Sequence, residues 1–270
     1  MIAPVMYSLL HATFRSGKRA LSLRDEWLQL AAAPDRVQHI FAADCDDEIS
    51  TAYPSIASGV IGDPMPGVSA VRNWNAAARA ADGDILVVIA DDLHPCQNWD
   101  VELDAVVRDL DPRRVPFVIK IRDTSDHPCK DHICHPIISR RYFERFGLWH
   151  PGYNGVFVDH DFTLSAHAHG IVLDGRNIWF THEHPSEGAH PNESQERMRI
   201  EISQTNAKVL LNRRWPSWKR HIRRRYYDPP ATKTMVSEFH RWTRSAMSKM
   251  GYAKALVPES LRRRIRDSRS

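Results

Sequence analysis

Asp84-Ile-Leu-Val-Val-Ile-Ala-Asp91-Asp92 is a run of apolar residues that ends on two adjacent carboxylates. Turn formers bound it, with Gly83 before and Pro95 after, so it predicts a central strand covered on both faces, as in a parallel sheet. Ligands of open α/β sheets bind at the carboxyl ends of such strands. Two like charges there repel unless a cation or hydrogen-bond donors lie beside them, and a divalent metal carrying a phosphate is the simplest such arrangement. Alternatively, the two aspartates only cap the next helix or form an Asx turn.

The chain before this stretch alternates between strand and helix. We expect a strand over residues 5–10, a helix over 19–33 and a second strand over 37–43 that runs into Asp44. Strand, helix and strand within about 40 residues are typical of a right-handed βαβ unit. Asp44 is then a second carboxylate at a strand end, and it either accepts hydrogen bonds from a nucleobase or ribose or is an ordinary turn residue.

The elements around and after the central strand continue this alternation. A short strand is expected near residues 58–61, a helix over 69–81 and a helix over 99–110. Lys120 interrupts the apolar run of a strand over 116–121, which indicates a less buried position. Two short strands are expected over 171–174 and 177–181. The sequence therefore predicts an α/β protein.

Composition limits the class of protein. At 270 residues, the chain suits one large domain or one domain with an appendage. No apolar run approaches the roughly 18 residues of a membrane helix, and the first residues do not resemble a signal peptide, so a cytoplasmic protein is expected. The four cysteines are too scattered for a disulfide framework, which favours reduced thiols.

The formal net charge of +4 conceals a basic C-terminal part. From Asn212 to the end there are 17 Lys and Arg against 4 Asp and Glu, so the rest of the chain is net acidic. Over residues 213–227 the cations alternate with Trp and Tyr, which is typical of nucleic-acid binders. The same composition suits a peripheral contact with anionic lipid or a solvated surface. We favour the lipid contact over nucleic acid.

The order of residues 5–10, 37–44 and 70–92, with Arg72 and Asn73 on the helix before the diacid, resembles the nucleotide-sugar half of the GT-A glycosyltransferases. The inverting family two is the most similar group, and the resemblance spans about residues 5–185. It implies a GT-A (Rossmann-like) fold over residues 1–190, with a mixed, mainly parallel sheet flanked by helices. A basic helical C-terminal extension would then occupy residues 191–270.

The resemblance also implies roles for individual residues. Ala90 stands where the family's DxD motif has its first aspartate, which leaves Asp92 as a ligand of Mn²⁺ or Mg²⁺. Either His184 or His182 would add a further metal ligand, and the choice is open because a His-x-His pair in a strand puts both rings on one face. The implied nucleotide-sugar-binding residues, with UDP-sugar the expected donor, are Thr13, Arg15, Asp44, Arg72, Asn75 and Asp91.

Residues 143–170 resemble the family's acceptor segment, with Val158 at the position of its usual glutamate. The resemblance makes Asp159 the catalytic base and Asp161 the acid that follows it. An inverting transfer needs such a carboxylate to take the acceptor hydroxyl's proton. Alternatively, both aspartates only favour a helix N-terminus.

One cluster suggests different chemistry. Cys129, His132, Cys134 and His135 lie within seven residues and offer a structural Zn²⁺ site, although the spacing fits no strong zinc-finger pattern. The expected function is metal-dependent, inverting transfer of a sugar from a nucleotide sugar to a hydroxyl of a glycan or lipid-linked acceptor. A peripheral location at the inner face of the membrane is compatible with the basic C-terminal part. The alternative is a catalytically silent protein that binds a nucleotide sugar, or a nucleic acid or anionic surface through its basic tail.

Overall fold

A computed structural model of the chain describes residues 5–13, 17–43, 69–123, 132–169 and 171–183, with 206, 209, 210, 212 and 213. The chain divides into two compact units, residues 1–125 with 132–221 and residues 126–131 with 222–270. All described residues belong to the first unit. The domain boundary near residue 190, most of the basic extension and the short strand near 58–61 lie outside the described residues and stay predictions.

A six-stranded sheet organises the first unit, with strand order β2-β1-β3-β6-β5-β7. The strands are β1 (Tyr7–Ala12), β2 (Val37–Ala42), β3 (Ile85–Ala90), β5 (Phe117–Arg122), β6 (Ile137–Ser139) and β7 (Ile171–Trp179). β1 pairs in parallel with β2 and β3, and β7 in parallel with β5, whereas β6 runs antiparallel to its neighbours β3 and β5. The predicted mixed, mainly parallel sheet is confirmed.

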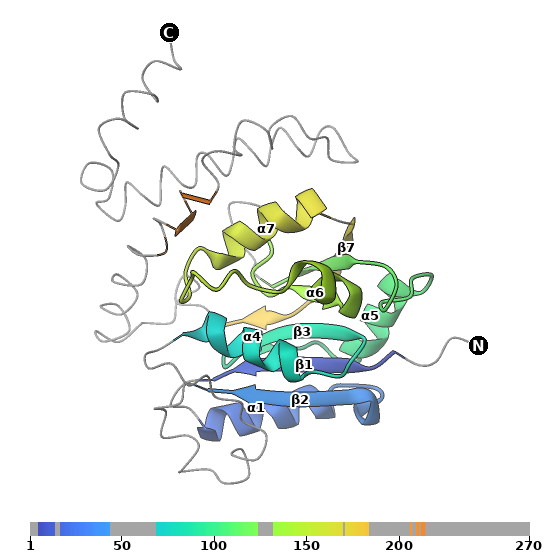
Figure 1. Cartoon of the computed structure of the whole chain (residues 1–270). Helices are drawn as coiled ribbons and strands as arrows, with labels where there is room; N and C mark the ends of the chain where they lie inside the picture. The colour runs from blue at the N-terminus through green and yellow to red at the C-terminus, as the bar shows by residue number, and fades with distance from the viewer. Residues whose placement is uncertain are drawn as a thin grey trace. The chain divides into compact units, whose positions relative to one another are not determined.

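Helices flank the sheet on both faces (Figure 1). The helices are α1 (Gly17–Gln29), the 3₁₀ turn η1 (Pro34–Arg36), α4 (Ala70–Ala80), α5 (Trp99–Val107), α6 (Arg140–Phe146) and α7 (Val158–His169). α1 and α5 share one core with β1, β3 and β5, in which Trp99 packs against both Tyr7 and Trp27. α4 contacts β1 and β2. It lies on the opposite face, because right-handed crossovers that run in opposite directions along a sheet use opposite faces.

Local chemistry fixes where β3 begins. The residues from Ile85 to Ile89 are fully buried, as the apolar run predicts. A Cβ at Gly83 would lie 2.6 Å from Ser8 Oγ, so only glycine allows the turn before β3 to approach β1 this closely. Arg140 donates to the carbonyls of Ala81 and Gly83, which ties this turn to α6. These contacts anchor the start of β3, which is the end opposite the two aspartates.

Two predictions about the second half of the sheet were wrong. Lys120 is only 9% exposed, because Asp123 lies beside it and supplies a counter-charge inside the protein. Residues 171–179 form one strand, because its pairing with β5 jumps from Gly175 to Trp179 and absorbs the predicted break. Within the described residues no helix is both long and apolar enough to cross a membrane.

Candidate functional site

Asp91 and Asp92 follow β3, and their side chains have different partners. Asp91 Oδ1 lies 2.9 Å from His11 Nε2, and Asp91 Oδ2 accepts a hydrogen bond of 3.1 Å from Thr13 Oγ1. Both partners come from the end of β1, because parallel pairing brings the carboxyl ends of β1 and β3 together. The structure therefore brings together Thr13 and Asp91, two of the predicted nucleotide-binding residues.

A second histidine lies behind His11. His11 Nδ1 is 3.2 Å from Nε2 of His39 on the neighbouring strand β2. Burial, together with the nearby His11 and Arg24, lowers the pKa of His39 well below its usual value, so His39 is neutral. With His11 donating from Nε2 to Asp91, its Nδ1 accepts from His39, and the two rings hold the carboxylate in one orientation. The sequence analysis missed His11, a polar residue near the end of a strand that is buried on both faces.

Asp92 pairs with a histidine that lies much later in the chain. Its Oδ2 lies 3.4 Å from His182 Nε2, because β4 (Leu93–His94) pairs antiparallel with β8 (Thr181–His182). Burial alone would raise the pKa of Asp92, but the hydrogen bond and charge of His182, with the charges of His135 and Arg19, lower it. Asp92 is therefore an ionised carboxylate beside an imidazole.

This pair fits the divalent metal that the resemblance implies. Ligand atoms about 2.1 Å from one octahedral ion lie roughly 3 Å apart, close to the spacing of the Asp92 oxygen and the His182 nitrogen. Their oxygen and nitrogen donors suit Mn²⁺, which accepts both types. His184, the other predicted histidine ligand, lies outside the described residues.

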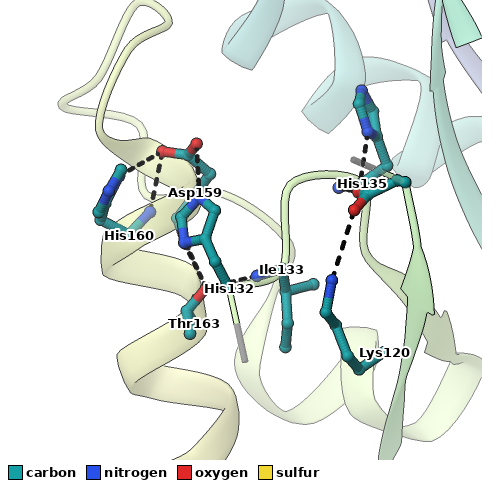
Figure 2. A network of polar contacts seen from close by, with 8 residues as sticks. Lys120, His132, Ile133, His135, Asp159, His160 and Thr163 are labelled. Carbon is teal, nitrogen blue, oxygen red and sulfur yellow. Dashed lines mark hydrogen bonds and ion pairs between the residues drawn. The ribbon is translucent and has the colours of Figure 1, made fainter. Parts of the chain in front are cut away.

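A buried charge network lies behind His182. The rings of His135 and His182 meet edge to face, with centroids 4.6 Å apart. His135 Nδ1 is 3.1 Å from Asp123 Oδ2, and Asp123 Oδ1 is 3.4 Å from Lys120 Nζ (Figure 2). Burial opposes the charge on Asp123, but His135 and Lys120 hold its pKa far below the usual value. These contacts with Asp123 fix the ring of His135 that packs against His182.

Asp159 opens α7 between two histidines (Figure 2). Its Oδ2 lies 3.0 Å from His132 Nε2, and its Oδ1 lies 2.9 Å from both the backbone nitrogen and Nδ1 of His160. Burial would raise the pKa of Asp159, but His160 and His132 lower it well below its usual value. The side chain stays 30% exposed. Asp159 is thus an anion that solvent or a substrate can reach.

Asp161 has a different environment from Asp159. Its Oδ2 accepts a 3.1 Å hydrogen bond from Arg213 Nε, and its side chain is only 4% exposed. No local pattern in the sequence indicates this partner, which is 52 residues away. Asp159 is therefore accessible, whereas Asp161 is enclosed.

A short segment connects the two groups of residues. His132 contacts Asp159, and His135, three residues on, packs against His182 beside Asp92. Three residues of extended chain span at most about 11 Å. One short segment therefore links the carboxylate on α7 to the Asp92–His182 pair, and the predicted zinc-binding residues His132 and His135 contact different groups. Cys129 lies outside the described residues.

The remaining predicted nucleotide-binding residues are Asn75, Arg72, Arg15 and Asp44, and the structure describes the first two. The Asn75 amide donates to the carbonyl of Trp149 at 2.9 Å and accepts from its N–H at 3.0 Å, which ties α4 to the loop after α6. Arg72 lies half-buried in the first turn of α4. Arg15 and Asp44 lie outside the described residues. The nucleotide contacts of all four stay predictions.

Arg19 is a residue of the site that the sequence analysis missed. From α1, its Nε donates to the backbone oxygen of Asp91 at 2.5 Å, and its Nη2 lies 2.6 Å from Glu183 Oε2. Glu183 N in turn donates to the backbone oxygen of Asp92 at 2.8 Å. Arg19 thus places a half-exposed cation at the end of β3 and holds the segment after β8 against it.

The sequence matches no protein-family model and no curated protein. Solved structures do resemble it. The mannosyltransferase PcManGT from Pyrobaculum calidifontis, in complex with GDP-Man and Mn²⁺, has a TM-score of 0.55 at 15% identity, over 94% of this chain and 77% of that one. S. aureus TarS 1-349 in complex with UDP-GlcNAc has a TM-score of 0.52 at 13% identity, over 77% and 67%. Glucosyl-3-phosphoglycerate synthase from Mycobacterium tuberculosis, in complex with Mg²⁺ and UDP, has a TM-score of 0.52 at 12% identity, over 77% and 79%. At these identities the likeness shows a shared fold, that of the GT-A glycosyltransferases.

Proposed function

We propose that this chain, which has the GT-A glycosyltransferase fold, is a metal-dependent glycosyltransferase that moves a sugar from a nucleotide sugar to a hydroxyl acceptor with inversion. The observation that carries the proposal is the segment 132–135, which joins the accessible Asp159 to the Asp92–His182 pair. The solved relatives support it, since their complexes contain GDP-Man with Mn²⁺, UDP-GlcNAc, or UDP with Mg²⁺.

In this proposal the end of β3 holds the donor. Asp92 and His182, with His184 beyond the described residues, would hold Mn²⁺ or Mg²⁺, which would supply positive charge against the charge on a departing diphosphate. Asp91, oriented by His11 and Thr13, accepts hydrogen bonds from the ribose hydroxyls. A UDP-sugar is the proposed donor.

Asp159 takes the acceptor's proton. An inverting displacement needs a base on the face of the sugar opposite the leaving group. Asp159 suits this role because it is ionised and accessible, whereas Arg213 encloses Asp161. We assign Asp161 to holding the start of α7 and Asp159 to the proton transfer.

The acceptor is proposed from charge alone. The basic extension suits an anionic surface, so a glycan or lipid-linked acceptor at the inner face of the membrane is the proposed setting. A protein that binds a nucleotide sugar without turnover is the competing function. It is favoured by the fact that both Asp159 oxygens already have imidazole partners.

A thermal-shift panel tests the donor half. UDP or another nucleoside diphosphate should raise the melting temperature more with Mn²⁺ than without, since a ligand at 100 times its Kd stabilises the folded state by about 2.7 kcal/mol. Asp92→Ala should remove the Mn²⁺-dependent part of the shift. Asp25→Ala, an exposed carboxylate on α1, is the matched control and should leave it unchanged. Full Mn²⁺-dependent stabilisation of Asp92→Ala would refute the metal assignment. Transfer of the sugar from the bound donor to an acceptor would distinguish a transferase from a protein that only binds the nucleotide sugar.

A further inference from the structure

Three metal-binding side chains of different chemistry converge next to the accessible carboxylate. One ligand atom each from His132, Cys134 and Asp159 lies within 4.8 Å of the others. His132 is buried, and Cys134 and Asp159 are half-buried. The first two come from the segment before β6 and the third from the start of α7, so the fold, and not sequence spacing alone, assembles this group.

We propose that His132, Cys134 and Asp159 form a second metal site that takes Zn²⁺ and that, when filled, blocks Asp159 as a proton acceptor. Its blocking effect rests on the proposed function, whereas its metal binding does not. Zn²⁺ binds imidazole, thiolate and carboxylate in tetrahedral sites, and three protein ligands leave the fourth position to water. Mg²⁺ and Mn²⁺ prefer oxygen donors, so the thiolate of Cys134 selects against the metal proposed at Asp92.

The distances suit a tetrahedral ion after a small adjustment. Ligand atoms about 2.0–2.3 Å from Zn²⁺ lie roughly 3.3–3.8 Å apart. His132 Nε2 and Asp159 Oδ2 are 3.0 Å apart, slightly closer than this range, and the full set extends to 4.8 Å. Because the His132–Asp159 pair is already close, the adjustment falls on the side chain of Cys134.

Hydrogen bonds behind the cluster prepare His132 for a cation. Thr163 Oγ1 donates to the backbone oxygen of Asp159 at 2.8 Å and accepts from Ile133 N at 3.0 Å. His132 Nδ1 lies 3.5 Å from the same hydroxyl oxygen, whose hydrogen is already donated (Figure 2). A metal ion between His132 Nε2 and Asp159 Oδ2 would replace the hydrogen that these two atoms share, while Nδ1 keeps its contact with the hydroxyl. Such an outer contact on the other ring nitrogen is typical of metal-binding histidines.

Because the proposed zinc site includes Asp159, a bound Zn²⁺ would affect the transfer reaction. A carboxylate that coordinates Zn²⁺ through Oδ2 is a much weaker base, and Oδ1 of Asp159 already lies 2.9 Å from the backbone nitrogen and Nδ1 of His160. Asp92 and His182 are not members of the cluster, so donor binding persists while transfer stops. Zinc would thereby inhibit the enzyme without competing with the nucleotide.

Metal binding is tested first, with no reference to activity. The full-length protein, saturated with Mn²⁺ and UDP, is titrated with Zn²⁺ in a calorimeter and with Co²⁺ in a spectrophotometer, where a bound thiolate gives a charge-transfer band in the near ultraviolet. The variant is Cys134→Ser, with Cys134→Ala as a second variant and circular dichroism as the check on folding. Cys96→Ser is the matched control, because Cys96, like Cys134, is a half-buried cysteine outside any disulfide but is packed against the core of α1 and α5.

We expect one tight Zn²⁺ and the Co²⁺ band in the wild type and in Cys96→Ser. Both Cys134 variants should lose the band and at least about tenfold in Zn²⁺ affinity, the scale of losing one ligand or its support. Unchanged affinity and band in the Cys134 variants would overturn the proposal, as would the absence of any Zn²⁺ binding to the wild type.

The activity arm then separates the two proposals. Zn²⁺ should inhibit transfer by the wild type and Cys96→Ser, a chelator should restore it, and Cys134→Ser should resist inhibition. Equal inhibition of Cys134→Ser would mean that zinc acts at the Mn²⁺ site, which overturns this inference and leaves the transferase assignment intact. A Cys134-dependent Co²⁺ band in a protein with no transferase activity would support the metal site and refute the proposed function.

Discussion

Asp123→Ala should destabilise the protein more than any exposed carboxylate substitution, because it leaves a cation buried. Asp123 is 1% exposed, and its Oδ1 lies 3.4 Å from Nζ of Lys120, which is 9% exposed. Its Oδ2 accepts a 3.0 Å hydrogen bond from His135 N and lies 3.1 Å from His135 Nδ1. The substitution removes the carboxylate partner of Lys120 and of both His135 groups at once.

The expected loss is about 3–5 kcal/mol, the cost of breaking a buried ion pair by removing one partner. The unpaired His135 N–H groups belong to the same loss and are not added to it, because contributions within one network are not additive. Adding Lys120→Met to Asp123→Ala should recover at least about 1 kcal/mol, since neither charge is then buried. This recovery distinguishes an unpaired charge from a simple packing defect.

Urea unfolding followed by circular dichroism measures these differences as changes in midpoint at constant slope. Asp174→Ala removes an exposed carboxylate that pairs with Arg176 and should change stability by less than about 0.5 kcal/mol. A loss below about 1 kcal/mol for Asp123→Ala, or a double variant as unstable as the sum of the two single variants, would refute the reasoning.

The pH dependence provides an independent check with a defined sign. The pKa of Asp123 in the folded protein lies below its unfolded value, so its contribution to stability is present above about pH 4 and is lost as the pH falls through the folded pKa. The stability advantage of the wild type over Asp123→Asn should therefore be constant from about pH 5 to 7 and shrink below about pH 4. An advantage that is unchanged at low pH would show that the charge on Asp123 is not its source.

Three further predictions concern the site. Asp159→Asn should lower turnover by about 10²–10⁴-fold in steady-state kinetics and preserve nucleotide affinity, whereas Asp161→Asn should mainly lower the melting temperature; the reverse pattern would exchange their roles. Asp44→Ala should weaken the preferred nucleotide by about 1–3 kcal/mol in calorimetry and blur base preference, and an unchanged preference would leave Asp44 as a turn residue. His11→Leu should weaken binding of UDP more than of its deoxyribose analogue, since Asp91 loses an orienting partner, and equal losses would contradict the ribose role.

Local patterns in the sequence determined the elements and the edge where the site lies. The fully apolar run before Asp91 predicted β3, because only a strand covered on both faces buries every side chain. Ser69 caps α4 by accepting from Arg72 N at 3.2 Å, and α7 opens at Val158, where Asp159 and Asp161 favour a helix N-terminus. Parallel pairing then brings Thr13 and Asp91 together, because each of them follows one of two neighbouring parallel strands.

Only the tertiary structure decided which charged and ligating groups meet. His182 reaches Asp92 through the pairing of β4 with β8, and His132 reaches Asp159 across 27 residues. Lys120 is buried because Asp123 lies beside it, and Arg213 encloses Asp161 from 52 residues away. Periodicity and capping are local and therefore visible in the sequence. Long-range register and the compensation of buried charge depend on which distant groups share one low-dielectric space, and only the folded chain defines that.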